Sequence, residues 1–229
     1  ISAYGGDAAW EKLKRCRIRF RTVVHMPQAE KEMGYNAVVT EDCYSHPAKL
    51  RRTVQRESDG SQILLSVVNG DRMWLVSAGG PPMSRSCDPD IACPAVISGV
   101  KRLMQLRDSG QALRLEAPEE YEGRKVVPLT ILSDGIPAST TYVDESTGLP
   151  VREVKQTIDA SDPPESFKRT ALVETVYTDY ENINGAVLPT VMQVFQAGTL
   201  MMEVKVLKVE FPETLPSELF EPLEGQAPE

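Results

Sequence analysis

Hydrophobic and polar residues alternate along much of the chain, a pattern that predicts extended strands. The longest alternating part contains three runs rich in Val, Thr, Tyr and Phe: Arg169–Tyr180, Ala186–Ala197 and Thr199–Phe211. Asn184-Gly185 and Gly198 lie in the short breaks between them, and such residues adopt the positive φ angles that tight reversals need. We therefore predict an antiparallel meander of long strands that curls around an apolar interior.

The last of these runs changes its hydrophobic parity. One parity holds Leu200, Met202, Val204 and Val206, and the other holds Leu207, Val209 and Phe211. A change of apolar face within one strand indicates a bulge or a sharp bend. We predict a bulge at Val206-Leu207; the alternative is a strand that leaves one layer and joins another.

A long first hairpin is predicted from Arg15–Met26 and Met33–Tyr44. A register with Cys16 opposite Cys43 also places Phe20 opposite Val39 and Val24 opposite Tyr35. Because this register pairs apolar with apolar side chains, it predicts a Cys16–Cys43 disulfide across the two strands. Reduced thiols are the alternative.

Two further cysteines, Cys87 and Cys93, lie in a Pro/Gly-rich loop over residues 79–94. No histidine lies near them in the sequence, so a local disulfide is favoured over a metal site. An even number of cysteines is compatible with an oxidising compartment.

The remaining elements complete an α+β pattern. Two helices are predicted, one over Ala8–Lys14 with Asp7 as its cap, and one over Ala95–Ser109 with an apolar stripe. The other predicted strands are Lys49–Ser58, Gln62–Asn69, Arg72–Ser77, Ala112–Ala117, Lys125–Ser133, Ala138–Asp144 and Val151–Ile158. About a dozen strands with two helices, and no evident linker, predict a single α+β domain over residues 1–229.

Composition and residue spacing argue against several classes of function. A net charge of −8 argues against nucleic-acid binding, and no stretch is long and apolar enough for a membrane span. The two histidines, His25 and His46, have no partner at a catalytic spacing and are interpreted as surface residues. The acidic pair Asp144-Glu145 is interpreted as a solvated turn rather than a calcium site. We therefore predict no catalytic residue, no metal and no cofactor.

The chain starts at Ile1, which fits either a removed signal peptide or a piece cut from a larger protein.

Four segments together resemble a known family. They are A-Y-G-G…A-W-x-K-L-K (Ala3–Lys14), V-V-N-G-D-x-x-W-L (Val67–Leu75), Y-V-D-E-x-T-G-L-P-V-R (Tyr142–Arg152) and D-Y-x-x-I-N-G-x-x-L-P (Asp179–Pro189). With the long first hairpin and the mid-chain helix, they are similar to bacterial outer-membrane lipoprotein-sorting proteins of the LolA/LolB-like fold. The resemblance implies a curved antiparallel half-barrel with helices covering its concave face, an apolar cavity for acyl chains, and a place in the periplasm or cell envelope.

The expected function is non-enzymatic binding of a hydrophobic small molecule or acyl chain. The expected lining of the cavity is Phe20, Val24, Tyr35, Val39, Trp74, Val100, Leu103, Met104, Met202 and Val204. A second hypothesis is a protein-interaction or sensor module of the envelope, with another envelope protein as partner and a cavity filled by its own side chains. A third is a hydrolase with a dispersed acid pair.

Overall fold

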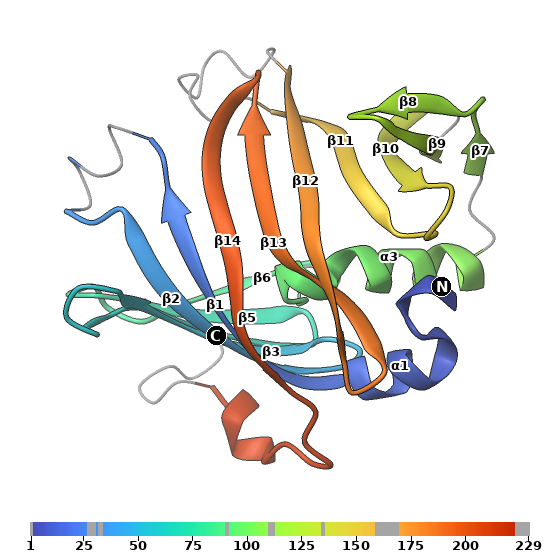
Figure 1. Cartoon of the computed structure of the whole chain (residues 1–229). Helices are drawn as coiled ribbons and strands as arrows, with labels where there is room; N and C mark the ends of the chain where they lie inside the picture. The colour runs from blue at the N-terminus through green and yellow to red at the C-terminus, as the bar shows by residue number, and fades with distance from the viewer. Residues whose placement is uncertain are drawn as a thin grey trace.

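One antiparallel sheet organises the protein (Figure 1). In the computed structural model, residues 2–26, 31, 34–89, 92–109, 113–133, 136–158 and 170–222 are described. Within these ranges the sheet has fourteen strands: thirteen follow the order β6-β5-β4-β3-β2-β1-β14-β13-β12-β11-β10-β9-β7, and the fourteenth, β8, pairs with β9. The pairing of β1 with β14 joins the first hairpin to the last strand, so the two ends of the chain meet in the middle of the sheet.

The strands have the following bounds. They are β1 (Arg15–Val24), β2 (Ala37–Ser45), β3 (Lys49–Arg56), β4 (Gln62–Asn69), β5 (Arg72–Ser77), β6 (Met83–Ser86), β7 (Leu113–Leu115), β8 (Glu119–Tyr121), β9 (Arg124–Ser133), β10 (Ile136–Asp144), β11 (Pro150–Ile158), β12 (Thr170–Ile183), β13 (Ala186–Gln196) and β14 (Thr199–Glu210). The predicted meander is therefore confirmed as β12, β13 and β14. The sequence analysis missed β6 and β8, which are short and largely exposed and carry no apolar alternation.

The sheet curves into a half-barrel that stays open, because β6 and β7 form separate edges. Figure 1 shows α1 (Gly6–Leu13) and α3 (Ala95–Ser109) within the curvature of the sheet. The bounds of α3 are those predicted from its apolar stripe. Two short 3₁₀ segments, η1 (Ser2–Tyr4) and η4 (Ser217–Phe220), lie near the ends of the described chain. The α+β half-barrel is thus confirmed; none of the helices in the described ranges has the length and hydropathy to cross a membrane.

The predicted bulge in β14 is confirmed. Arg19 of β1 pairs with Lys208, but the next residue, Phe20, pairs with Val206, so Leu207 has no opposite residue. The extra residue lets Val204 and Val209 face the helices although their parities differ, since both pack in the hydrophobic core. Bulges of this kind increase local twist, which helps a long sheet to curve.

The predicted register of the first hairpin is wrong by one residue. Cys16 lies opposite Tyr44, and Cys43 lies opposite Arg17. Because side chains alternate between faces, Cys16 points toward the helices and Cys43 points to the other side of the sheet. A Cys16–Cys43 disulfide is therefore excluded. Met33, the first residue of the predicted second strand, lies outside the described residues.

The predicted Cys87–Cys93 disulfide is also wrong, since none of the four cysteines is joined in a disulfide. The backbone N–H of Cys87 is bound to the carbonyl of Asp71, whereas Cys93 packs against the core that contains Cys16. The loop is thus fixed by these contacts rather than by a local cross-link.

Alkylation should therefore find four thiols. In denaturant without reductant, we expect mass spectrometry to show four added alkyl groups on each chain, equal in number to a sample treated first with dithiothreitol. In the native protein, Cys87 should react long before Cys16, because Cys16 is fully buried and burial raises the pKa of its thiol. Two labels instead of four in unreduced, denatured protein would contradict the structure.

The convex face carries a second, smaller buried patch. Trp74 pairs with Val67 on the face opposite to Met73 and Val68, and both are buried. The C-terminal segment covers part of this face: Phe220 of η4 is buried, and the side-chain amide of Asn69 donates to its carbonyl at 3.2 Å. Figure 1 shows η4 on the side of the sheet away from α3.

Candidate functional site

The concave face under α3 is filled by side chains. Cys16 and Ile18 of β1 are fully buried there, and Phe20 is nearly so. They share one hydrophobic core with buried side chains of α3, namely Val96, Ile97, Val100 and Met104, and with Met192 and Val204 of the sheet. The apolar stripe of α3 is therefore used for packing, and it fixes the helix in the half-barrel.

Beyond this core, one row of side chains crosses six strands on the same concave face. The register places Val24 opposite Met202, and Met202 opposite Val194. Val194 lies opposite Thr175, Thr175 opposite Glu153, and Glu153 opposite Thr141. The row is thus apolar on β1, β14 and β13 and polar on β12, β11 and β10. Its apolar half is open, since Met202 is 38% exposed and Val24 and Val194 are half-buried.

Glu153 is the centre of the polar half. Its carboxylate accepts a hydrogen bond of 3.0 Å from the hydroxyl of Tyr177, and it lies 4.0 Å from the guanidinium of Arg102 on α3. Burial and the adjacent carboxylate raise the pKa of Tyr177 well above its ordinary value, so its hydroxyl stays protonated and donates. The side chain of Glu153 is 18% exposed, so one part of it remains accessible from the concave side.

An ion pair lies deeper on the concave face. Asp42 is fully buried on the same face as Ile18, and its two oxygens accept hydrogen bonds of 2.8 and 2.7 Å from Arg52. Burial raises the pKa of the Asp42 carboxyl, and the bonds from Arg52 oppose that rise. The two-point geometry and the partial exposure of Arg52, whose side chain is 32% exposed, favour the charged pair.

Contacts between aromatic rings hold η1 and α1 against the sheet. The ring of Tyr4 packs edge-on against Tyr180, whose hydroxyl donates to the carbonyl of Pro150 at 2.9 Å. His46, interpreted above as a surface residue, is partly buried, with its ring edge-on to Trp10 and its Nδ1 3.2 Å from the hydroxyl of Tyr44. Burial lowers the pKa of His46, and Lys101 and Lys14 lower it further. His46 therefore packs between α1 and the sheet, where it contacts Trp10 of α1 and Tyr44 of β2.

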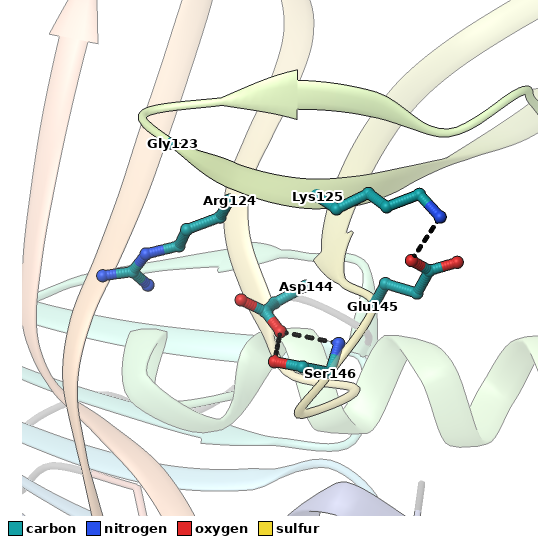
Figure 2. A pocket seen from close by; sticks show the side chains of 6 residues that line it. All are labelled: Gly123, Arg124, Lys125, Asp144, Glu145 and Ser146. Atoms are coloured by element: carbon teal, nitrogen blue, oxygen red, sulfur yellow. Dashed lines mark hydrogen bonds and ion pairs between the residues drawn. The ribbon is translucent and has the colours of Figure 1, made fainter.

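A recess of polar residues lies away from the concave row, between the β8–β9 and β10–β11 turns (Figure 2). It is lined by Gly123, Arg124, Lys125, Asp144, Glu145 and Ser146. One oxygen of Asp144 accepts hydrogen bonds from the hydroxyl of Ser146 at 2.5 Å and from the backbone N–H groups of Ser146 and Thr147, both at 2.9 Å. The bond from the Ser146 hydroxyl, together with these backbone bonds, lowers the pKa of this carboxyl. Glu145 pairs with Lys125 at 2.8 Å. Both carboxylates are thus engaged in turn structure, and the described residues contain no group of three metal-ligand side chains.

The structure brings most of the predicted lining residues together. Phe20, Val24, Met202 and Val204 lie on the concave face, and Val100, Leu103 and Met104 of α3 pack against or within its core. Tyr35 lies before β2, with its ring centre 5.7 Å from the guanidinium of Arg56. Val39 and Trp74 point to the convex side, because the first hairpin is shifted by one residue and because Trp74 follows Met73.

Sequence reasoning missed the polar half of the row. Glu153 and Thr175 belong to predicted strands, but only the pairing of β11 with β12 makes them neighbours of Val194 and Met202. The alternation within each strand assigns two faces without saying which face is concave. The register of these successive strand pairings, which the pattern within one strand does not fix, decides which residues share the row.

Comparison with known proteins supports the fold. No family model and no curated protein sequence matches this chain. Among solved structures, a LolA superfamily protein from Nitrosomonas europaea superposes with a TM-score of 0.59 at 11% identity, covering 94% of this chain and 96% of that one. A DUF1329 family protein from Desulfovibrio piger gives a TM-score of 0.59 at 13% identity, covering 95% of both chains. A putative outer membrane lipoprotein-sorting protein domain from Vibrio parahaemolyticus gives 0.55 at 7% identity, again covering 95% of both. The chain therefore has the half-barrel fold of LolA-superfamily proteins along almost its whole length.

Proposed function

We propose that this protein is a non-enzymatic binding protein of the cell envelope, and that it holds the apolar part of a ligand on the open concave wall beside α3. The observation that carries the proposal is the contiguous apolar surface of Val24, Met202 and Val194 on the concave face. Contiguous apolar surface that stays accessible beside a packed core is one of the features that mark ligand-binding grooves.

The fold supports the same proposal. Its solved relatives include a protein described as an outer-membrane lipoprotein-sorting domain, which is consistent with an exported protein and with an acyl chain as ligand. Each methylene removed from water contributes about 0.8 kcal/mol, so the apolar wall needs to cover only part of a chain to bind it. We further propose that residues 1–229 act as one binding domain.

Native mass spectrometry and a matched pair of variants test the proposal. We expect protein purified without detergent to retain an apolar molecule, or after delipidation to bind a dodecyl amphiphile in calorimetry. Met202→Glu should weaken this binding by about 10-fold or more, because it places a charge on the apolar wall. Leu172→Glu is the control, since Leu172 is 54% exposed and lies on the opposite face of β12 from Thr175. Equal effects of the two variants would contradict the proposal.

A second function has one specific observation in its favour. The floor beneath α3 is filled by Val96, Ile97, Val100 and Met104, as expected for an interaction or sensor module that needs no ligand. Failure to retain or bind any apolar molecule in the experiment above would favour that function, with another envelope protein as the partner.

A further inference from the structure

The concave row changes from polar to apolar along a single line. Glu153 lies four strands away from Val24, which at the usual spacing of neighbouring strands is about 19 Å. Thr141 and Thr175 flank Glu153 on the two adjacent strands, and Val194 and Met202 follow on the next two. A molecule lying along the row would therefore meet hydrogen-bonding groups at one end and only apolar side chains at the other.

The charges at the polar end are mixed. Glu153 supplies acceptor oxygens, while Arg102 on α3 lies 4.0 Å away, and the exposed Lys155 lies two residues further along β11 on the same face. A carboxylate accepts about four hydrogen bonds, and among the described residues only Tyr177 is seen to donate one to Glu153. Donors and acceptors thus stand together, and the polar end presents both signs of charge, with one carboxylate beside two cations.

This combination favours a head group with hydroxyls and no net charge. A hydroxyl both donates and accepts, so it can bond to Glu153 and to a neighbouring cation or threonine at once. An anionic head would face the carboxylate of Glu153, and a cationic head would face Arg102 and Lys155. Like charges placed together in this way disfavour binding.

We propose that the row orients an amphiphile with an uncharged, hydroxyl-bearing head of the glycerol or sugar type at Glu153, and with its apolar tail along Val194, Met202 and Val24. The inference rests on the proposed function, because it names the class of ligand and its direction on the same wall. Glu153 is the residue that determines specificity for the head, and Tyr177 positions its carboxylate.

Calorimetry with three amphiphiles of equal tail length tests the inference. Dodecyl glucoside, dodecanoate and dodecyltrimethylammonium are titrated into the delipidated protein below their critical micelle concentrations. We expect dodecyl glucoside to bind at least about 5-fold more tightly than either charged compound, and Glu153→Gln to weaken it by about 10-fold, as for loss of a hydrogen bond to a charged group. The same variant should leave dodecanoate binding unchanged or stronger. The tyrosine hydroxyl can still donate to the glutamine oxygen, so the fold should be kept.

The control variant is Glu181→Gln, which removes the same charge from an exposed position of β12 and should change none of the three affinities. Equal binding of all three compounds, tightest binding of either charged one, or no effect of Glu153→Gln on the glucoside would overturn the inference and leave the proposed function standing. Failure of all three compounds to bind would instead overturn the proposed function.

Discussion

Replacing Gly5 by alanine should destabilise the protein more than any other single methyl group added to a described glycine. Gly5 has a φ of 100°, which L-residues rarely adopt, and it is the N-cap residue directly before α1. A Cβ there would fall well inside contact distance of the carbonyl oxygen of Gly185 and 2.8 Å from the Cβ of Ala9. The first of these neighbours is backbone, so relief requires a shift of the whole helix start.

A shift of the helix start would disturb the junction between α1 and the turn from β12 to β13. The side chain of Lys12, on α1, donates a hydrogen bond to the carbonyl of Asn184 in this turn. Leu13, the last residue of α1, is fully buried. We expect Gly5→Ala to lower the free energy of unfolding by about 2–4 kcal/mol, from backbone strain together with displaced packing. Urea denaturation followed by circular dichroism measures this loss.

Gly6→Ala is the matched control for that experiment. Gly6 also has a positive φ, of 69°, but a Cβ there would meet nothing within 4 Å. Its cost should be limited to the backbone conformation, about 1 kcal/mol. If both variants lost the same stability, the close approach of Gly5 to Gly185 would not exist in solution.

The second large effect is expected at the buried ion pair. Asp42→Ala removes the carboxylate and leaves the guanidinium of Arg52 on the concave face without its two-point partner. Loss of one member of a buried pair costs about 3–5 kcal/mol, and the 32% exposure of the Arg52 side chain places the expected loss at the lower end of that range, about 3 kcal/mol. Chemical denaturation checks the value.

A double variant separates lost charge pairing from lost packing. Asp42→Ala combined with Arg52→Met removes both charges, and it should recover at least about 1 kcal/mol relative to Asp42→Ala alone. Glu145→Ala, which breaks an exposed pair with Lys125, should change stability by less than about 1 kcal/mol. A double variant no more stable than the single one would show that Arg52 without Asp42 carries no unpaired-charge penalty.

Particular residues show which features of this fold can be predicted from the residue pattern within one segment. The parity change in β14 located a bulge that the structure contains at Leu207, because a bulge is a local event on one strand. The apolar stripe of α3 gave its bounds. In the first hairpin, in contrast, the alternation of apolar residues favours a register one residue away from the one the structure has, in which Cys43 and Val39 lie on the convex face.

In the candidate site, too, some residues can be predicted from the pattern of one strand, while others are placed only by strand pairing. Met202 and Val204 were expected to line the cavity because they are apolar and alternate on one strand. Glu153 was not expected to face them, although its strand was predicted. Its position follows from three successive pairings, of β11 with β12, β12 with β13 and β13 with β14.

The sequence by itself determined that this protein is a curved antiparallel sheet with a helix to cover it, because periodicity, turn residues and bulges act over a few neighbouring residues. The tertiary structure alone decided which face of each strand is concave, which cysteines remain apart, and where the polar half of the row begins. Those outcomes depend on the register between paired strands, which the pattern within a single strand does not fix, and a shift of one residue reverses the face of every side chain.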